Sequence, residues 1–113
     1  MENNYKLYRV RELADNDEDF VKSLVEAFLE EVPEDAERME KAVHAKNYEE
    51  AYQAAHKMKP TVDLFELGVL QDLIVIQDWG KFKKEGETCK DELQLVMNAV
   101  HNATEELKED FNL

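Results

Sequence analysis

His56 is the residue whose type and neighbours best support chemistry in this sequence. It lies in the run AAHKMKP, where two lysines follow it within three residues in an otherwise acidic chain. An exposed imidazole is largely neutral and nucleophilic at cellular pH. On a helix, Lys59 would lie one turn from His56 on the same face, where its ammonium could neutralise an oxyanion carried on the ring. The pattern therefore indicates a histidine able to hold a phosphoryl group.

The apolar residues around His56 predict the direction in which it points. At about 100° per residue, one face of the helix gathers apolar side chains, and His56 lies nearly opposite that face. We therefore expect an exposed imidazole rather than a histidine of the core. The apolar face comprises Ala51, Ala54, Ala55, Met58, Val62 and Phe65.

The other two histidines lack this setting. His44 and His101 have no lysine three residues later, and we expect both to be ordinary surface residues. A di-iron bundle needs glutamate three residues before a histidine, but Lys41, Gln53 and Asn98 occupy these positions. No two histidines are four residues apart, as a zinc-binding helix requires. We expect no metal site and no cofactor bound by this chain.

Length and charge narrow the choice of partners. The 113 residues suit a single domain spanning 1–113. Acidic residues number 27 and basic residues 14, for a net charge of −13, which repels nucleic acids and anionic membranes. We expect neither as a partner. Cys89, the only cysteine, is interpreted as a near-surface thiol without a disulfide; with no signal peptide or membrane span in the sequence, this favours the cytoplasm.

Helical periodicity runs through most of the sequence. A short opening helix or ordered arm is expected over residues 5–13, and no segment alternates with the period of two typical of strands. Amphipathic segments follow at 48–65, 67–82 and 93–111, with the clearest turn at 83–86. Short connections imply antiparallel neighbours. We therefore predict an all-α fold: an up-and-down antiparallel four-helix bundle with an additional short N-terminal helix, present as a monomer.

The second helical segment contains a proline. Acidic cap candidates at 15–19 precede an apolar stripe that recurs every three to four residues. Pro33 interrupts the stripe, so either a new helix starts there or one long helix bends. The segment ends near residue 46. Its stripe comprises Phe20, Leu24, Phe28, Val32, Ala36, Met39 and Val43.

The run AAHKMKP, followed by a hydrophobic helix from about Leu67, resembles the histidine-containing phosphotransfer (HPt) domain family. Its motif is roughly an alanine, the phosphoacceptor histidine, two variable residues, then lysine and glycine. The upstream runs FVKSLVEAFLEEVPEDAERMEKAV and NYEEAYQAAH are also similar, and the resemblance covers about residues 9–107. It implies that His56 accepts the phosphoryl group and that Lys59 steadies it. The Mg²⁺ is then expected on a partner receiver domain.

Three positions depart from the family pattern. Pro60 stands where the motif has glycine, Glu66 replaces a second glycine, and Asp63 replaces a small residue. Proline is compact, so access for a partner is retained, but it frees the carbonyl of His56, and we expect a kink just beyond the site. The two carboxylates put negative charge near the docking surface.

The resemblance also predicts which residues surround the ring. A partner would dock over the stripe of His56, and a polar residue on the next helix would support the imidazole. Gln77 and Asp78 are the two candidates for that support. The docking residues expected are Tyr52, Gln53, Lys57, Pro60 and Asp63.

The function predicted is that of a phosphorelay intermediate. His56 would receive a phosphoryl group from a receiver aspartate and pass it to another response-regulator receiver, in a pathway that begins with a hybrid sensor histidine kinase. Three scattered glycines offer no nucleotide site, so we do not expect an enzyme with its own kinase activity. The alternative is an acidic helical adaptor of the same fold that binds a signalling partner and is not phosphorylated.

Overall fold

The computed structural model describes residues 2–113, and within this range every regular element is a helix. The prediction of an all-α fold is therefore confirmed. The α-helices have these bounds: α1 Tyr8–Leu13, α2 Glu18–His44, α3 Tyr48–Leu64, α4 Leu70–Lys81 and α5 Lys90–Phe111. Not one of them is long and apolar enough to cross a membrane within the described range.

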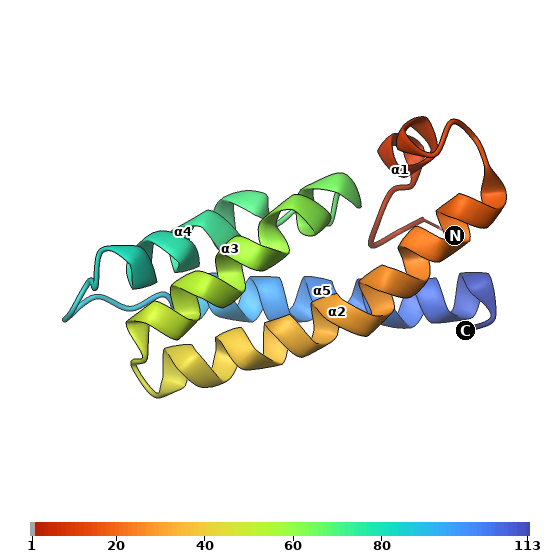
Figure 1. Ribbon diagram of the computed structural model, residues 1–113. Helices are drawn as coiled ribbons and strands as arrows, with labels where there is room; N and C mark the ends of the chain where they lie inside the picture. Colours follow the sequence, from red (N-terminus) through yellow and green to blue (C-terminus); the bar gives the residue numbers. More distant parts are fainter. Residues whose placement is uncertain (1) are drawn as a thin grey trace.

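The four longer helices pack in sequential order around a shared core. α2 contacts α3, α3 contacts α4, and α4 contacts α5, which closes the bundle against α2. In Figure 1 the long helices α2 and α5 run along the molecule, and the hairpin of α3 and α4 lies over one part of them. The short α1 lies near the beginning of α2, at the end where both chain termini meet. This is the predicted up-and-down bundle with an additional N-terminal helix.

Side-chain caps explain where two of the helices begin. The Asp17 carboxylate accepts hydrogen bonds from the backbone N–H groups of Asp19 and Phe20, at 3.0 and 3.3 Å. The Asn47 amide oxygen accepts from the N–H of Glu50 at 3.2 Å. Both caps satisfy donors that a helix leaves unpaired at its start. The acidic run at 15–19 thus begins α2, and Asn47 begins the helix that carries His56.

Neither proline ends a helix. α2 continues through Pro33 as one helix, so the interpretation that a new helix starts there is wrong. α3 likewise continues through Pro60 to Leu64. A proline in a helix removes one backbone hydrogen bond and its ring crowds the preceding turn, but the buried side chains on either side hold the chain in the helix. Around Pro33 these are Phe28, Val32, Ala36 and Met39.

Two expectations about burial are wrong. Phe20 is 45% exposed, because the buried face of α2 begins with Val21 and Val25 and is rotated from the predicted stripe. Cys89 is only 1% exposed and so is not a near-surface thiol. It precedes α5 by one residue and falls in register with Leu93, four residues later, on the core face.

The N-terminal segment closes the end of the bundle near α1. The N–H of Lys6 donates to the carbonyl of Phe65, just beyond α3, at 2.8 Å. The Tyr5 hydroxyl donates to Asp110 near the end of α5, at 2.5 Å, while its ring is buried. Inside the bundle the rings of Phe28 and Phe65 lie 4.8 Å apart. These contacts fix the C-terminal end of α3 against its neighbours.

Candidate functional site around His56

α3 buries one face and exposes His56 on the other. All six apolar residues of the predicted face are at most 1% exposed, whereas His56 is exposed to solvent. The Cβ directions of a helix make this division unavoidable once one face packs on the core. The expectation of an imidazole outside the core is confirmed.

Gln77 on α4 holds one edge of the imidazole. Its side-chain Oε1 lies 3.2 Å from Nδ1 of His56, and Gln77 itself is only 8% exposed. An amide oxygen only accepts hydrogen bonds, so Nδ1 carries the hydrogen and donates it. The other ring nitrogen, Nε2, then has a free lone pair. Of the two residues proposed for imidazole support, the structure brings Gln77 to the ring; Asp78, the next residue, makes no hydrogen bond to it.

Tyr52 covers one face of the same ring. It precedes His56 by four residues, so the two side chains are neighbours on the helix surface. Their ring centroids are 5.6 Å apart and the ring planes are inclined by 28°, which is a stacked arrangement. Tyr52 is half-buried. The imidazole is therefore held at an edge by α4 and over a face by its own helix.

Gly80 sets how closely α4 approaches α3. A Cβ at this position would lie 2.5 Å from the carbonyl oxygen of Tyr48 and 2.8 Å from the backbone nitrogen of Tyr52. Only glycine fits, because the atoms it meets belong to the backbone of α3. Gly80 lies one turn beyond Gln77, so this close approach also brings the Gln77 amide within reach of the ring.

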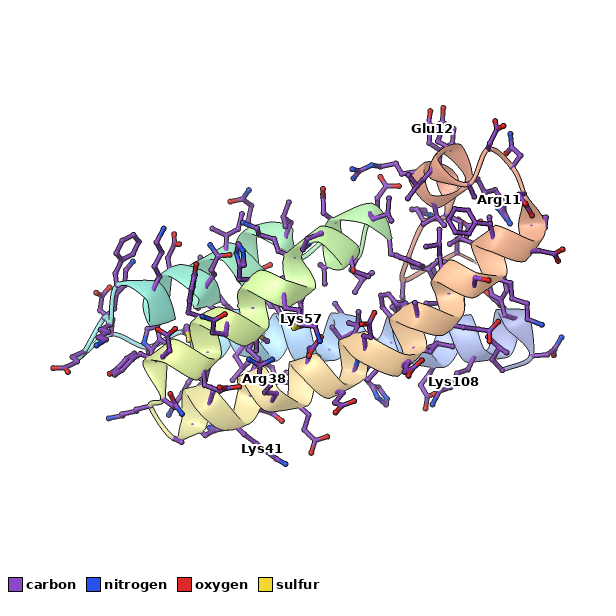
Figure 2. All side chains as sticks on the ribbon, in the orientation of Figure 1. Arg11, Glu12, Arg38, Lys41, Lys57 and Lys108 are labelled. Carbon is purple, nitrogen blue, oxygen red and sulfur yellow. The ribbon has the colours of Figure 1, made fainter. Side chains whose placement is uncertain are left out.

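The two lysines that follow His56 have different surroundings. Lys57 extends to α2, where its Nζ lies 3.1 Å from Asp35. Figure 2 shows Lys57 of α3 extending toward Arg38, which is also on α2. Lys59 is half-buried and makes no ion pair or hydrogen bond with any residue of the described range. Lys57 is therefore engaged with α2, whereas Lys59, without a partner among the described residues, remains available one turn from His56.

A buried acid explains the direction of Lys57. Asp35 is 6% exposed and is contacted by Lys57 and by Arg38, which lies 3.8 Å away. Arg38 also pairs with Glu50 on α3. A buried carboxylate requires such partners to offset its lost hydration. This network ties α2 to α3 beside an open groove of about 880 Å³ that is lined by acidic and basic side chains of both helices.

The remaining residues expected at the docking surface lie along α3. Gln53 is exposed and donates to Glu49 at 2.9 Å, and Pro60 is exposed one turn beyond His56. Asp63 is paired with Arg9 of α1, whose Nη1 lies 3.4 Å from the carboxylate and 3.0 Å from the Asp63 carbonyl oxygen. The negative charge of Asp63 is thus paired with Arg9 of α1 at a part-exposed position.

The comparison with known protein families agrees with this geometry. Residues 23–75 match the Hpt domain family model, and the match includes His56 and Lys59. Residues 23–75 are thus similar to Hpt domains. This match supports a general role in histidine phosphotransfer within a phosphorelay, as a carrier rather than a typical enzyme. No curated protein and no solved structure matches the chain.

Two features of this chain were not recognised from the sequence. Gly80 stood as a lone glycine inside an apolar helix, a pattern that often marks close packing and could have identified it. Asp35 gave no such signal, since an acidic residue within a charged helix normally faces solvent. Its burial depends on Lys57 and Arg38 reaching it from two different helices.

Proposed function

We propose that His56 accepts a phosphoryl group from the phosphorylated aspartate of a receiver domain and passes it to the aspartate of another receiver. One observation carries this proposal: the imidazole is exposed, and Gln77 binds Nδ1 so that Nε2 is the free nitrogen. A nucleophile needs an available lone pair and a fixed direction, and this arrangement provides both.

The transfer step follows from the tautomer. The Nε2 lone pair of His56 attacks phosphorus and forms an N–P bond, while the bond from phosphorus to the aspartyl oxygen breaks. The aspartate leaves as a carboxylate with the bonding electron pair. The ring, which keeps its hydrogen on Nδ1, gains one positive charge that the Gln77 Oε1 stabilises by accepting that hydrogen bond. The reverse step phosphorylates the next receiver.

Lys59 is proposed to steady the phosphoryl group. It has no partner of its own among the described residues, and a flexible ammonium one turn from His56 can reach oxygens attached to Nε2. The receiver domain supplies the aspartate and the Mg²⁺. Phosphoryl transfer depends chiefly on alignment and charge stabilisation, so this chain needs little further machinery. We propose that it works as a monomer in the cytoplasm, between a hybrid sensor histidine kinase and response-regulator receivers.

Transfer from a phosphorylated receiver tests this function directly. His56→Gln should fold like the parent protein and accept no phosphoryl group, because glutamine lacks the nucleophilic ring. His101→Gln is the matched control, since His101 is an exposed histidine on α5 that the proposal does not use. Label retained on the His56→Gln variant would contradict the proposal. Binding to a receiver without any transfer by the parent protein would instead favour the unphosphorylated adaptor.

A further inference from the structure

The stacked contact between Tyr52 and His56 has no role in the transfer step described above. Tyr52 could be a core residue, a docking residue or a support for the ring. Its side chain is only half-buried, and its hydroxyl makes no hydrogen bond with any residue in the described range. Its one ring contact there is the face of His56, with centroids 5.6 Å apart and planes inclined by 28°. The surroundings therefore favour an action of the aromatic face on the imidazole.

An imidazole on a helix surface has two side-chain torsions to fix. The bond from Gln77 to Nδ1 restrains one edge of the ring, but a single hydrogen bond of 3.2 Å permits the plane to rotate about it. A stacked aromatic ring restrains the plane, because the two faces keep contact only when they remain nearly parallel. Together the two contacts determine both the position and the plane of the imidazole.

We propose that Tyr52 is a positioning residue for the phosphoacceptor, which holds the plane of the His56 ring so that Nε2 points out from α3 toward an incoming phosphoryl group. The inference rests on the proposed function for its consequence in transfer. The contact between Tyr52 and the His56 ring does not itself depend on that function. Because the hydroxyl has no partner among the described residues, it is the aromatic face of Tyr52 that holds the imidazole. Phenylalanine at this position should therefore serve as well as tyrosine.

The backbone supports this position for Tyr52. Gly80 of α4 packs against the backbone nitrogen of Tyr52, so the turn of α3 that carries the tyrosine packs directly against α4. The same contact brings Gln77 to the opposite part of the site. Tyr52 and Gln77 therefore belong to one closely packed helix pair, α3 and α4, which keeps both side chains in fixed positions relative to the ring.

Three variants test the role of Tyr52. Tyr52→Leu removes the aromatic face but keeps an apolar side chain with high helix propensity. Tyr52→Phe keeps the face and removes only the hydroxyl. Tyr8→Leu is the matched control, because Tyr8 is a 72% exposed tyrosine on α1 that lies outside the site. Circular dichroism should show the same helicity for all three variants.

The first measurement is the transfer rate as a function of phosphorylated-receiver concentration. We expect Tyr52→Leu to lower the rate at saturating receiver about threefold to tenfold, the factor that corresponds to losing one aromatic contact. The receiver concentration for half-maximal rate should change little. Tyr52→Phe should restore the rate. A Tyr52→Leu variant that changes only the half-maximal concentration would overturn the proposal, because Tyr52 would then act in docking.

The second measurement needs no receiver. Long-range ¹H–¹⁵N spectra distinguish the two imidazole tautomers of His56 in the free protein. Rotation of the ring plane bends the hydrogen bond from Nδ1 to Gln77 and so weakens its hold on the tautomer. We therefore expect one tautomer with hydrogen on Nδ1 in the parent and in Tyr52→Phe, and averaged nitrogen shifts in Tyr52→Leu. Unchanged shifts in Tyr52→Leu would overturn the proposal. Failure of the parent protein to accept phosphate would contradict the proposed function, yet these spectra would still decide whether Tyr52 holds the ring.

Discussion

At the residue scale, a single ring is held by side chains that have no reactivity of their own. Gln77 determines which nitrogen of His56 carries hydrogen, and Tyr52 restrains the plane of the ring. Lys59 is the nearby charge without a competing partner in the described chain. In the proposed function, these contacts turn an otherwise ordinary exposed histidine into a directed nucleophile.

The first prediction concerns Lys59. Replacing it with alanine should slow phosphoryl transfer to His56 roughly tenfold, because one favourable charge contact with a partly exposed dianion is lost. Lys59→Arg should recover much of the rate, since it restores the positive charge. Rapid-quench measurement of phosphohistidine formation gives these rates.

The control for this prediction is Lys22→Ala, which removes an exposed lysine of α2 outside the site. It should leave the transfer rate unchanged and so correct for the loss of one positive charge from the chain. If Lys59→Ala and Lys22→Ala transfer at the same rate, the role given to Lys59 is wrong.

The exposure of His56 could be predicted from sequence, while the direction of Lys57 could not. The first depends only on local periodicity, since six apolar residues fix one face of α3 and leave the opposite one outside. The second depends on Asp35, a residue of another helix that is far away in sequence. A contact between two helices can be predicted only when their relative placement is known, and the periodicity of one helix does not give that placement.

At the element scale, the pairing of α3 with α4 creates the site. α3 supplies His56 and Tyr52, and α4 supplies Gln77, so the distance between the two helices decides whether the ring is held. Gly80 permits that distance because its missing side chain leaves room for the backbone of α3. Helix packing and the chemistry of the ring therefore depend on the same residue.

The second prediction concerns Gly80. Gly80→Ala should lower the free energy of unfolding by about 1–3 kcal/mol, because its Cβ would overlap the backbone of α3 and force α4 outward. The higher helix propensity of alanine works in the opposite direction by about 1 kcal/mol, so a net loss isolates the steric effect. Urea unfolding followed by circular dichroism measures it.

The same substitution should release the imidazole. If α4 moves outward, the Gln77 amide loses contact with Nδ1, and the tautomer preference of His56 should weaken in ¹H–¹⁵N spectra. A Gly80→Ala protein with parental stability and a parental tautomer would show that the close approach of α4 is unnecessary.

Helix ends were easier to predict than helix continuity. The acidic run at 15–19 was identified as a source of caps because a local side chain satisfies a local backbone donor, and Asp17 caps α2 in the structure. Pro33 left two possibilities open because the outcome depends on packing. In the folded protein, buried residues on both sides of Pro33 contact the rest of the bundle, and α2 continues.

At the scale of the whole molecule, one core connects all the helices. It extends from Tyr5 and Val10 at the N-terminal end to Cys89 and Leu93 at the start of α5. Burial of the Cys89 thiol, assisted by the negative charge of Glu92, raises its pKa to about 11. Burial and the hydrogen bond to Asp110 likewise raise the pKa of Tyr5.

The third prediction is the alkaline dependence of stability. An unfolded thiol loses its proton near its ordinary pKa of about 9, whereas folded Cys89 keeps its proton until about pH 11. Between these values the unfolded state binds fewer protons, so the free energy of unfolding should fall as pH rises from about 9 to 11. Below about pH 8 this group should contribute no slope.

Cys89→Ala isolates the thiol from Tyr5, which contributes a decline of the same sign at higher pH. Urea unfolding at a series of pH values should give a smaller loss of stability for the variant than for the parent protein above pH 9. Parallel pH profiles for the two proteins would mean that the thiol is not buried in the way described.

The central claim is that the phosphoryl group resides on Nε2 of His56. The most direct test is to phosphorylate the protein with a phosphorylated receiver and to locate the group by peptide mass spectrometry and ³¹P–¹H NMR. We predict one acid-labile phosphoryl group, on the peptide that contains His56 and bonded to Nε2. A group found on Nδ1, on His44 or on His101, or no phosphorylation at all, would contradict the account.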